Sequence, residues 1–598
     1  MQSSSRTGLS RKLRRQQPCR EETLGEEAFS AIDRMREAAT AKLTGGFSPM
    51  ALTLAYLDWA IHLAAAPGKQ LELAAKAARK AARLGGHVAS GLFQPKADPC
   101  IAPLPGDRRF AAPEWSRPPF GFMAQAFLLN QQWWHNVTHE VPGVEPHHEE
   151  VVSFVARQLL DMFSPANNPL TNPEVIARAR ETGGVNFVEG WRNWIEDLQR
   201  QLAGQPPVGA ERFVVGRDVA ATPGKVVFRN HLIELIQYAP ATPTVRAEPI
   251  LIVPAWIMKY YILDLSPENS LVRYLVGAGY TVFCISWRNP DADDRELALD
   301  DYRRSGVMAA LDAIAAIMPG RKVHAAGYCL GGTLLAIAAA AMVRDADGRL
   351  ASLTFLAAQT DFGEPGELAL FIDTSELRFL DSMMWNRGYL SADQMAAAFQ
   401  LLRSNDLIWS RLVHDYLMGE RSPMFDLMAW NADSTRMPYR MQAEYLRGLY
   451  LDNDLASGRF MVEGRPAALQ NIRTPTFAVA TERDHVAPWR SVHKLHLLID
   501  ADLTFVLTSG GHNAGIVSKP GHPGRRYRML AKKHGDICLG PDEWFAAART
   551  REGSWWEAWT EWLEGLSSPE QVVPPAFGGA GSGREPLCDA PGTYVLQR

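Results

Sequence analysis

The chain has 598 residues, of which 46% are hydrophobic and 21% are charged, and its net charge is −4. This length exceeds the needs of one ordinary domain, and the charge excludes the strongly basic field of a nucleic-acid-binding protein. Six scattered cysteines without CxxC or Cys/His spacing predict reduced thiols, a cytoplasmic location and no metal site. The chain lacks a signal peptide pattern and an apolar stretch of about 20 residues, so we do not expect a transmembrane protein.

The N-terminal part predicts helices behind a short tail. Residues 1–25 are polar and basic and predict a disordered tail, and residues 26–90 predict a module of three helices. The second helix, Met50–Ala66, follows a Ser-Pro pair suited to a helix start and is apolar enough to be buried or interfacial. The third, Lys69–Leu84, is rich in Lys and Arg, which fits a solvated face or contact with an anionic or amphiphilic surface.

Residues 91–210 predict a Pro-rich linker followed by a helical domain, and the pattern changes at residue 211. There, Val226–Phe228 and Leu232–Tyr238 predict a hairpin. Further short apolar runs are Ile250–Val253, Thr281–Ile285, Val323–Ala326, Leu353–Leu356, Thr476–Ala480 and Leu503–Leu507. Such runs separated by helical segments predict a parallel sheet covered on both faces, so we assign 211–598 to one α/β catalytic domain.

Two segments of this domain have special patterns. The gap between the runs that end at Leu356 and begin at Thr476 is longer than one crossover helix requires, which predicts an inserted cap over about 362–445. The run Trp555–Trp562 has helical spacing. We interpret it as a helix that packs an aromatic stripe on the domain, in preference to a ligand box.

The motif Gly327-Tyr328-Cys329-Leu330-Gly331-Gly332 lies between a predicted strand and a predicted helix. This is the pattern of a nucleophile elbow with cysteine as the nucleophile, in which the backbone N–H of Leu330 faces the developing oxyanion. A thiol here suggests acyl transfer through a thioester. Taken alone, the motif also fits a buried structural cysteine.

Two later residues favour the catalytic interpretation. Asp484 follows one predicted strand and His512 follows the next, so a nucleophile, an acid and a histidine occur in that order, each past a strand end. This is the triad order of α/β hydrolases, whose active sites lie at that edge of the sheet. We therefore predict an α/β-hydrolase fold with an inserted cap, preceded by a mainly helical N-terminal domain, with Cys329, Asp484 and His512 as catalytic residues.

Longer motifs resemble one enzyme family. They are Lys259–Ser270, Ser286–Asp291, the Cys329 elbow, Asp484–Trp489 and Gly511–Gly515. Together they are similar to class I polyhydroxyalkanoate synthases, the poly-3-hydroxybutyrate polymerases, and the resemblance extends from about residue 107 to the C-terminus. Residues 30–70 resemble an extra N-terminal module of some of these polymerases. Two departures are Pro254-Ala255-Trp256-Ile257-Met258-Lys259, where the family has Pro-Pro-x-Ile-Asn-Lys, and Asn513, where an aliphatic residue is usual.

The resemblance implies a reaction and partners. The enzyme would polymerise (R)-3-hydroxyacyl-CoA, of short chain length such as 3-hydroxybutyryl-CoA, and release CoA through a covalent thioester on Cys329. The backbone N–H groups of Leu330 and Ile257 would hold the oxyanion, and Asp484 would help to activate the attacking hydroxyl as well as orient His512. The resemblance also implies a homodimer at the granule surface in the cytoplasm. No cofactor is expected, since coenzyme A is a product.

Two other functions fit parts of the pattern. The same fold hosts esterases, thioesterases and polymer depolymerases. A non-catalytic granule-coat protein would use the N-terminal helices alone, although the intact triad argues against it. The residues that contact the acyl group and CoA are not identified by the sequence.

Overall fold

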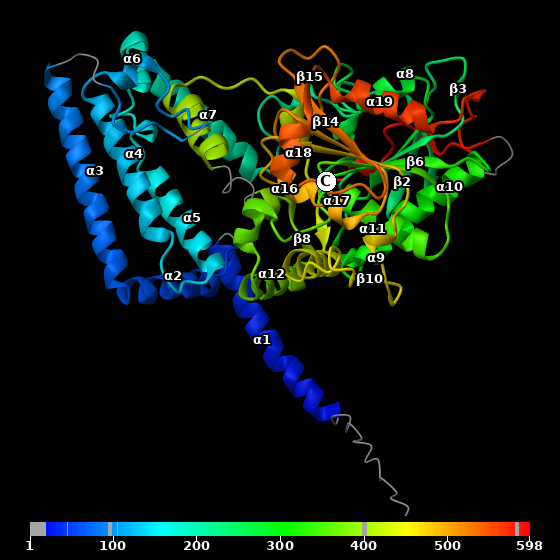
Figure 1. Cartoon of the computed structure of the whole chain (residues 1–598), viewed down its shortest axis with the longest axis horizontal. Helices are drawn as coiled ribbons and strands as arrows, with labels where there is room; N and C mark the ends of the chain where they lie inside the picture. Colours follow the sequence, from blue (N-terminus) through cyan, green and yellow to red (C-terminus); the bar gives the residue numbers. More distant parts are fainter. Residues whose placement is uncertain (1–19, 45, 94–97, 105, 397–403, 580–584) are drawn as a thin grey trace, which may run out of the picture.

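The computed structural model describes residues 20–44, 46–93, 98–104, 106–396, 404–579 and 585–598. Two lobes lie next to each other (Figure 1): a helical N-terminal lobe and an α/β lobe around a central sheet. Residues 1–19, most of the predicted tail, lie outside the described residues, and the first helix begins at Arg20. No helix in the described ranges is long and apolar enough to cross a membrane.

Seven helices make up the N-terminal lobe and its junction with the α/β lobe. They are α1 (Arg20–Thr44), α2 (Pro49–Ala64), α3 (Pro67–Phe93), α4 (Phe120–Thr138), α5 (Pro146–Met162), α6 (Pro173–Thr182) and α7 (Val185–Leu202). The hydroxyl of Ser48 caps α2 by accepting the N–H of Ala51 at 3.3 Å, as the Ser-Pro pair predicts. Among its residues only Ala55 is buried, so this apolar helix is a surface helix. The third helix extends beyond the predicted Lys69–Leu84 at both ends.

An eleven-stranded sheet forms the centre of the α/β lobe, in the order β15-β14-β13-β12-β7-β6-β4-β5-β2-β1-β17. The strands are β1 (Gly224–Arg229), β2 (Ile233–Tyr238), β4 (Ile250–Val253), β5 (Val282–Trp287), β6 (Val323–Tyr328), β7 (Leu350–Leu356), β12 (Thr476–Thr481), β13 (Leu503–Thr508), β14 (Arg526–Lys532), β15 (Arg549–Glu552) and β17 (Cys588–Asp589). The six strands from β13 to β5 are parallel, and antiparallel strands flank them. The predicted hairpin is β1–β2. The predicted fold class is confirmed.

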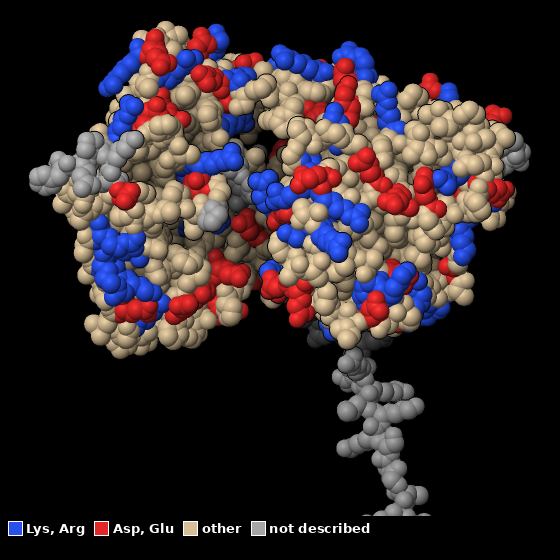
Figure 2. All heavy atoms as spheres, turned by 45° about the horizontal axis from the view of Figure 1, so that its top comes forward, with Lys and Arg blue, Asp and Glu red and all other residues tan. Residues whose placement is uncertain are grey.

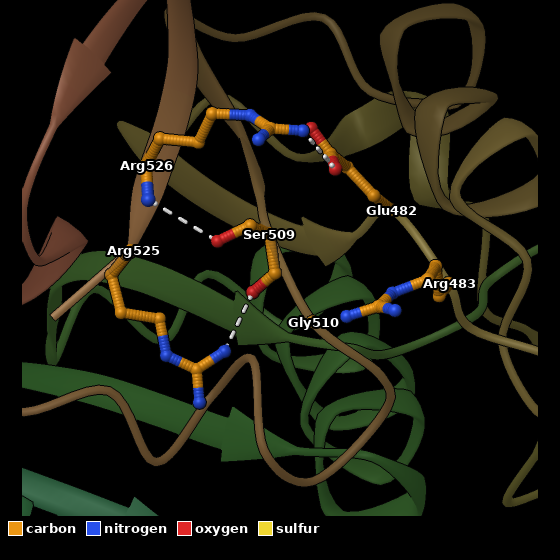
Figure 3. A pocket seen from close by; sticks show the side chains of 7 residues that line it. Glu482, Arg483, Ser509, Gly510, Arg525 and Arg526 are labelled. Atoms are coloured by element: carbon orange, nitrogen blue, oxygen red, sulfur yellow. Dashed lines mark hydrogen bonds and ion pairs between the residues drawn. The ribbon is translucent and has the colours of Figure 1, made fainter. Parts of the chain in front are cut away.

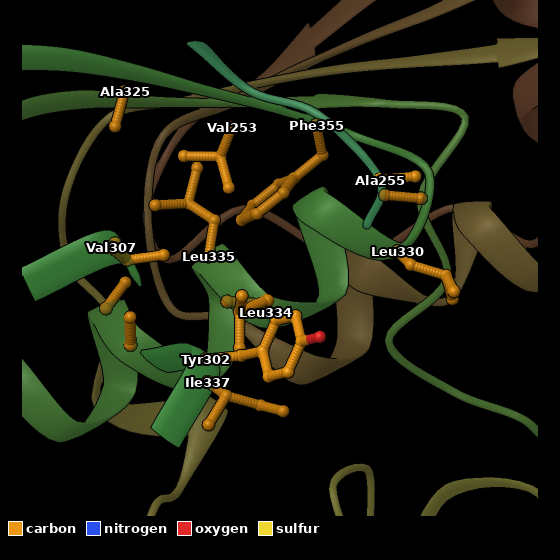
Figure 4. Close-up of a cluster of buried hydrophobic side chains, with 14 of the residues drawn as sticks. Val253, Ala255, Tyr302, Val307, Ala325, Leu330, Leu334, Leu335, Ile337 and Phe355 are labelled. Carbon is orange, nitrogen blue, oxygen red and sulfur yellow. The ribbon is translucent and has the colours of Figure 1, made fainter. Parts of the chain in front are cut away.

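Helices cover both faces of the sheet because the central strands alternate their apolar side chains between two cores. In β4, Leu251 and Val253 face one core, and Ile250 and Ile252 face the other. The first core is closed by α10 (Ala309–Ile317), α11 (Leu330–Arg344), α16 (Trp489–His493), α17 (Leu495–Leu498) and α18 (Pro541–Ala547), and the second by α8 (Leu271–Gly277) and α19 (Trp555–Leu566). Figure 4 shows Leu335 of α11 beside Val253 and Phe355 of the sheet, and Leu334 beside Tyr302.

The chain leaves the sheet after β7 and returns at β12, and the segment between them is the cap. Its main elements are α12 (Thr374–Arg387), β8 (Tyr389–Leu390), the π-helices η8 (Asn405–Trp409), η9 (Leu412–Leu417) and η10 (Leu446–Leu451), α14 (Asp426–Asn431), β9 (Met437–Pro438) and α15 (Tyr439–Tyr445), followed by the short hairpin of β10 (Met461–Val462) and β11 (Arg465–Pro466). The helical part begins near the predicted position and continues through η10, past residue 445. Residues 397–403 of the predicted cap lie outside the described residues.

The N-terminal helices contact the cap. The hydroxyl of Ser382 in α12 donates to Glu37 of α1 at 2.6 Å, and the backbone N–H of Ser48 donates to Glu376 at 2.9 Å. On the other side, Asn193 of α7 donates to the carbonyl of Asp415 in η9 at 3.0 Å. The cap therefore lies between the N-terminal lobe and the sheet. Lysine, arginine and acidic side chains are interspersed over both lobes in Figure 2, in keeping with the small net charge.

Candidate active site

Cys329 occupies the sharp turn between β6 and α11. Its φ is +51°, a left-handed conformation that residues other than glycine rarely adopt, and such a strained turn exposes the side chain at the sheet edge. A Cβ on Gly327 would lie 2.4 Å from the Cα of Gly332, and one on Gly331 would lie 2.1 Å from the carbonyl oxygen of Val253. The turn packs so closely on itself and on β4 that both positions require glycine.

The structure brings Cys329, Asp484 and His512 together at the carboxyl edge of the sheet. His512 Nδ1 and Asp484 Oδ2 are 2.8 Å apart, and Cys329 lies close enough for its charge to raise the pKa of His512. The Asp484 side chain is fully buried, and that of His512 is 10% exposed. A nucleophile, a base and a carboxylate that orients the base therefore lie in one line of contacts, as acyl transfer through a covalent intermediate requires.

Electrostatics favours a charged pair at the centre of this arrangement. Burial lowers the pKa of His512, but the charges of Asp484 and Cys329 and the hydrogen bond to Asp484 outweigh burial and hold that pKa well above its usual value. Burial likewise raises the pKa of Asp484, and the charge and hydrogen bond of His512 outweigh it, so the pKa stays below its ordinary value. His512 is thus suited to accept and hold a proton.

The Asp484 carboxylate has all of its acceptor positions engaged. Oδ1 accepts the backbone N–H groups of Val486 at 2.9 Å and Ala487 at 2.8 Å. Oδ2 accepts the hydroxyl of Thr481 at 3.1 Å in addition to His512. A carboxylate offers about four lone-pair positions, so these four donors saturate it. The group is held rigidly and is directed at His512.

The loop that carries His512 is anchored from two sides. The indole N–H groups of Trp555 and Trp556 donate to the carbonyls of Gly515 and Ile516, each at 3.0 Å. The predicted aromatic stripe is therefore a packing helix, as expected, and it also supports the loop that follows the histidine.

A second anchor joins that loop to the strand that precedes the nucleophile. The buried hydroxyl of Tyr328 donates to Asn513 Oδ1 at 2.5 Å, and the ring centroid of Tyr328 lies 5.8 Å from that of His512. Asn513 was noted in the sequence only as a departure from the family pattern. Its partner was missed because a tyrosine beside a cysteine motif gives no signal of where its hydroxyl points.

The predicted oxyanion residues lie on two adjacent segments. Leu330 is the first residue of α11, so its N–H has no acceptor within the helix. Ile257 lies in the loop after β4, the strand beside β6. Thr435 of the cap donates its hydroxyl to the carbonyl of Trp256 at 2.7 Å and its N–H to that of Ile257 at 3.2 Å, which fixes the orientation of these peptides. The donor role of Leu330 and Ile257 stays a prediction.

A pocket of about 340 Å³ adjoins the loops of Asp484 and His512. Figure 3 shows Arg483, Arg525 and Arg526 around it, with Arg526 directed at Glu482. Arg525 donates to the carbonyl of Ser509 at 3.2 Å, while burial and then the charge of Arg483 lower its pKa. The pocket is therefore positively charged, and an anion would stabilise it.

Residues 106–275 match the family described as Poly-beta-hydroxybutyrate polymerase (PhaC) N-terminus, residues 27–69 match Poly-beta-hydroxybutyrate polymerase N terminal, and residues 248–519 match the alpha/beta hydrolase fold. The Poly(3-hydroxyalkanoate) polymerase of Methylorubrum extorquens is 40% identical over 89% of this chain and 87% of its own length. The polymerase subunits PhaC of Rhizobium meliloti and Cupriavidus necator are each 37% identical over 82% of this chain, and over 80% and 83% of their own lengths. With an α/β-hydrolase sheet, a cysteine elbow and relatives this similar over most of its length, the chain belongs to the poly(3-hydroxyalkanoate) polymerase family of acyltransferases.

Proposed function

We propose that the chain polymerises short-chain (R)-3-hydroxyacyl-CoA into polyhydroxyalkanoate and releases CoA, through a covalent thioester on Cys329. The observation that carries the proposal is the contact between Cys329, His512 and Asp484 at the carboxyl edge of the sheet. Membership in the polymerase family supports the polymer as the product. The choice of a short acyl chain rests on the resemblance to class I enzymes.

Acylation follows from the three side chains. His512 takes the proton of Cys329 while the sulfur attacks the carbonyl carbon of the CoA thioester, and the N–H groups of Leu330 and Ile257 stabilise the oxyanion. The carbon–sulfur bond to CoA then breaks, and the CoA sulfur takes the proton from His512. One thioester replaces another, so the acyl group stays activated on Cys329.

Elongation uses the same base. The 3-hydroxyl of another acyl unit attacks the thioester on Cys329, His512 takes the hydroxyl proton, an ester forms, and the cysteine thiol regains a proton. The saturated carboxylate of Asp484 favours an indirect role in this step, because a substrate hydroxyl would have to displace one of its four donors. Asp484 would therefore activate the hydroxyl through His512.

The basic pocket supports CoA as the leaving group. Arg483 directly precedes Asp484 and its N–H donates to the carbonyl of Gly510 at 2.9 Å, so the pocket lies beside the reacting groups. CoA carries phosphates that arginine binds well. Arg483→Gln and Arg525→Gln should raise KM for 3-hydroxybutyryl-CoA. KM for 3-hydroxybutyryl-N-acetylcysteamine, which lacks the phosphates, should not change; an equal rise for both would argue against this use of the pocket.

The decisive test separates polymerisation from hydrolysis. Wild-type protein supplied with radiolabelled 3-hydroxybutyryl-CoA should release CoA and form polymer, with little free 3-hydroxy acid. Cys329→Ala should lose both activities because positioning alone cannot replace a covalent nucleophile. Cys329→Ser should also be poor, because a hydroxyl is far less acidic than a thiol. CoA release with free acid as the main product would identify a thioesterase instead.

The N-terminal lobe suggests how the enzyme is placed on the polymer. Helix α2 exposes a row of large apolar side chains, and the part of α1 that projects from the body in Figure 1 does the same. These residues are Phe29, Ile32, Met35, Met50, Leu52, Leu54, Tyr56, Leu57 and Ile61. An exposed apolar surface of this kind marks an interaction site, and the water-insoluble polyester product is an apolar surface. We propose that α1 and α2 hold the enzyme, as a homodimer, on the growing particle.

Matched substitutions test this placement. The triple variant Leu54→Gln, Leu57→Gln, Ile61→Gln should sediment less with polymer particles and keep its rate of CoA release from soluble substrate. The control variant Leu497→Gln, Ile537→Gln, Val573→Gln changes three apolar residues of the α/β lobe that are more exposed than the three in α2. Equal sedimentation of both variants would show that α2 does not bind the particle. A change in oligomeric state confined to the α2 variant would assign this face to the dimer.

A further inference from the structure

Two tyrosines of the cap form a hydrogen-bonded pair. Tyr445 is the last residue of α15, and Tyr450 lies in the π-helix η10 that continues it. The hydroxyl of Tyr445 donates to that of Tyr450 at 3.0 Å. In an α-helix, residues five apart lie roughly 140° apart around the axis. A π-helix, whose bonds join residues i and i+5, places them on the same side. The π-helix is therefore what brings the two hydroxyls together.

The pair lies over the reacting edge of the sheet. The ring of Tyr445 packs edge-on against Trp256, with centroids 6.3 Å apart, and Trp256 directly precedes Ile257. The ring of Tyr450 packs on Phe362, with centroids 4.7 Å apart, a few residues after the end of β7. Burial raises the pKa of both phenols, and the charge of Cys329 raises it further, so both lie within electrostatic reach of the nucleophile.

One donor of the pair is not used. Two hydroxyls hold two protons, and the bond between them uses one, so an O–H group remains. Among the described residues, Tyr450 donates to no acceptor, and its ring packs on Phe362 at the margin of the hydrophobic core. Tyr450 is half-buried, so this O–H can bond to water or to a polar atom of a bound molecule. The pair therefore offers one free hydrogen-bond donor to a substrate.

We propose that Tyr450, aligned by Tyr445, hydrogen-bonds to the 3-hydroxyl of the acyl group that is transferred to Cys329. This inference rests on the proposed function. The acyl group has two polar positions, and its carbonyl oxygen is assigned to the N–H groups of Leu330 and Ile257. The 3-hydroxyl, two carbons further along, is the position left for a donor on the cap side. The pair would make the site select 3-hydroxyacyl over plain acyl thioesters.

The test compares two acyl-CoA substrates of equal chain length in single turnover. They are 3-hydroxybutyryl-CoA and butyryl-CoA, which lacks the hydroxyl. The wild type should acylate Cys329 about ten-fold faster with the hydroxy compound, since one hydrogen bond to a substrate hydroxyl is at stake. Tyr450→Phe should abolish this preference and leave the rate with butyryl-CoA unchanged, and Tyr445→Phe should reduce it. Tyr439→Phe, at the other end of α15, is the matched control and should keep the preference.

The ratio of the two rates separates recognition from damage to the fold, because a misfolded variant loses both rates together. A wild type without preference, or a Tyr450→Phe variant that keeps it, would overturn the inference. Equal slowing with both acyl-CoA substrates, in a Tyr450→Phe variant that keeps the circular dichroism spectrum of the wild type, would assign the bond to the carbonyl oxygen and overturn the inference as well. A wild type that forms no acyl-enzyme with either donor would instead refute the proposed function.

Discussion

The hydrogen bond between Tyr328 and Asn513 should control the alignment of His512, the proposed base. Tyr328 is 2% exposed and precedes the nucleophile, while Asn513 follows His512 and is half-buried. Asn513→Val removes the only acceptor that the described residues offer the Tyr328 hydroxyl. A buried hydroxyl without a partner costs about 1–3 kcal/mol, which corresponds to about 5- to 150-fold in the balance between an aligned and a displaced loop.

The reciprocal change should cost less. Tyr328→Phe removes the hydroxyl and leaves Asn513 Oδ1, which water can reach because Asn513 is only half-buried. We expect a loss of about 1 kcal/mol, or about five-fold in rate. In the double variant neither group is left unsatisfied, so Tyr328→Phe should partly rescue Asn513→Val.

The assay is the single-turnover rate of CoA release for the four proteins of this double-mutant cycle. This readout is preferable to global unfolding, because a chain with more than one structural unit does not have a single unfolding free energy. A double variant slower than either single variant, by the product of their two effects, would show that the residues act independently. The reasoning about a shared bond would then be wrong.

Three further outcomes follow from the contacts around the site. The Asp484 carboxylate already accepts four hydrogen bonds, so we expect it to act through His512. Asp484→Asn and His512→Gln should then both slow acylation as well as elongation. A trapped acyl-enzyme found by mass spectrometry in Asp484→Asn alone would instead show that Asp484 acts directly in elongation. Trp555→Phe should lower the rate of CoA release without changing KM, because it removes the indole N–H that supports the His512 loop, and an unchanged rate would show that packing alone holds the loop. Burial raises the pKa of Glu376 to about 7 from 4.5, so the folded protein favours the protonated side chain. This protonation stabilises the contact between the N-terminal helices and α12. The stabilisation is complete below pH 4.5 and is lost as the pH rises through about 7. Hydrogen exchange of α1 should therefore be faster at pH 8 than at pH 6 after correction for intrinsic rates, and Glu376→Gln should remove the difference.

Much of this protein is determined by local sequence. The continuous apolar run of β4 indicates a strand buried on both faces, because each side chain of a central strand has a helix-covered core on its own side. The elbow around Cys329 can be predicted from the sequence because the turn itself requires its glycines. The chain order of Cys329, Asp484 and His512 indicates the edge at which they meet, since parallel strands all end there.

Only the tertiary structure decides which side chains support these residues. Asn513 lies 185 positions from Tyr328, and the indole of Trp555 lies 40 positions from the carbonyl it holds. Such hydrogen bonds depend on the orientation of a side chain on a packed helix or strand. The hydrophobic pattern of the sequence does not predict that orientation. The same holds for Tyr445 and Tyr450, since residues five apart do not meet in an α-helix. Local patterns therefore determine the elements and the reacting groups, while the packing of distant segments decides how those groups are held and what they can recognise.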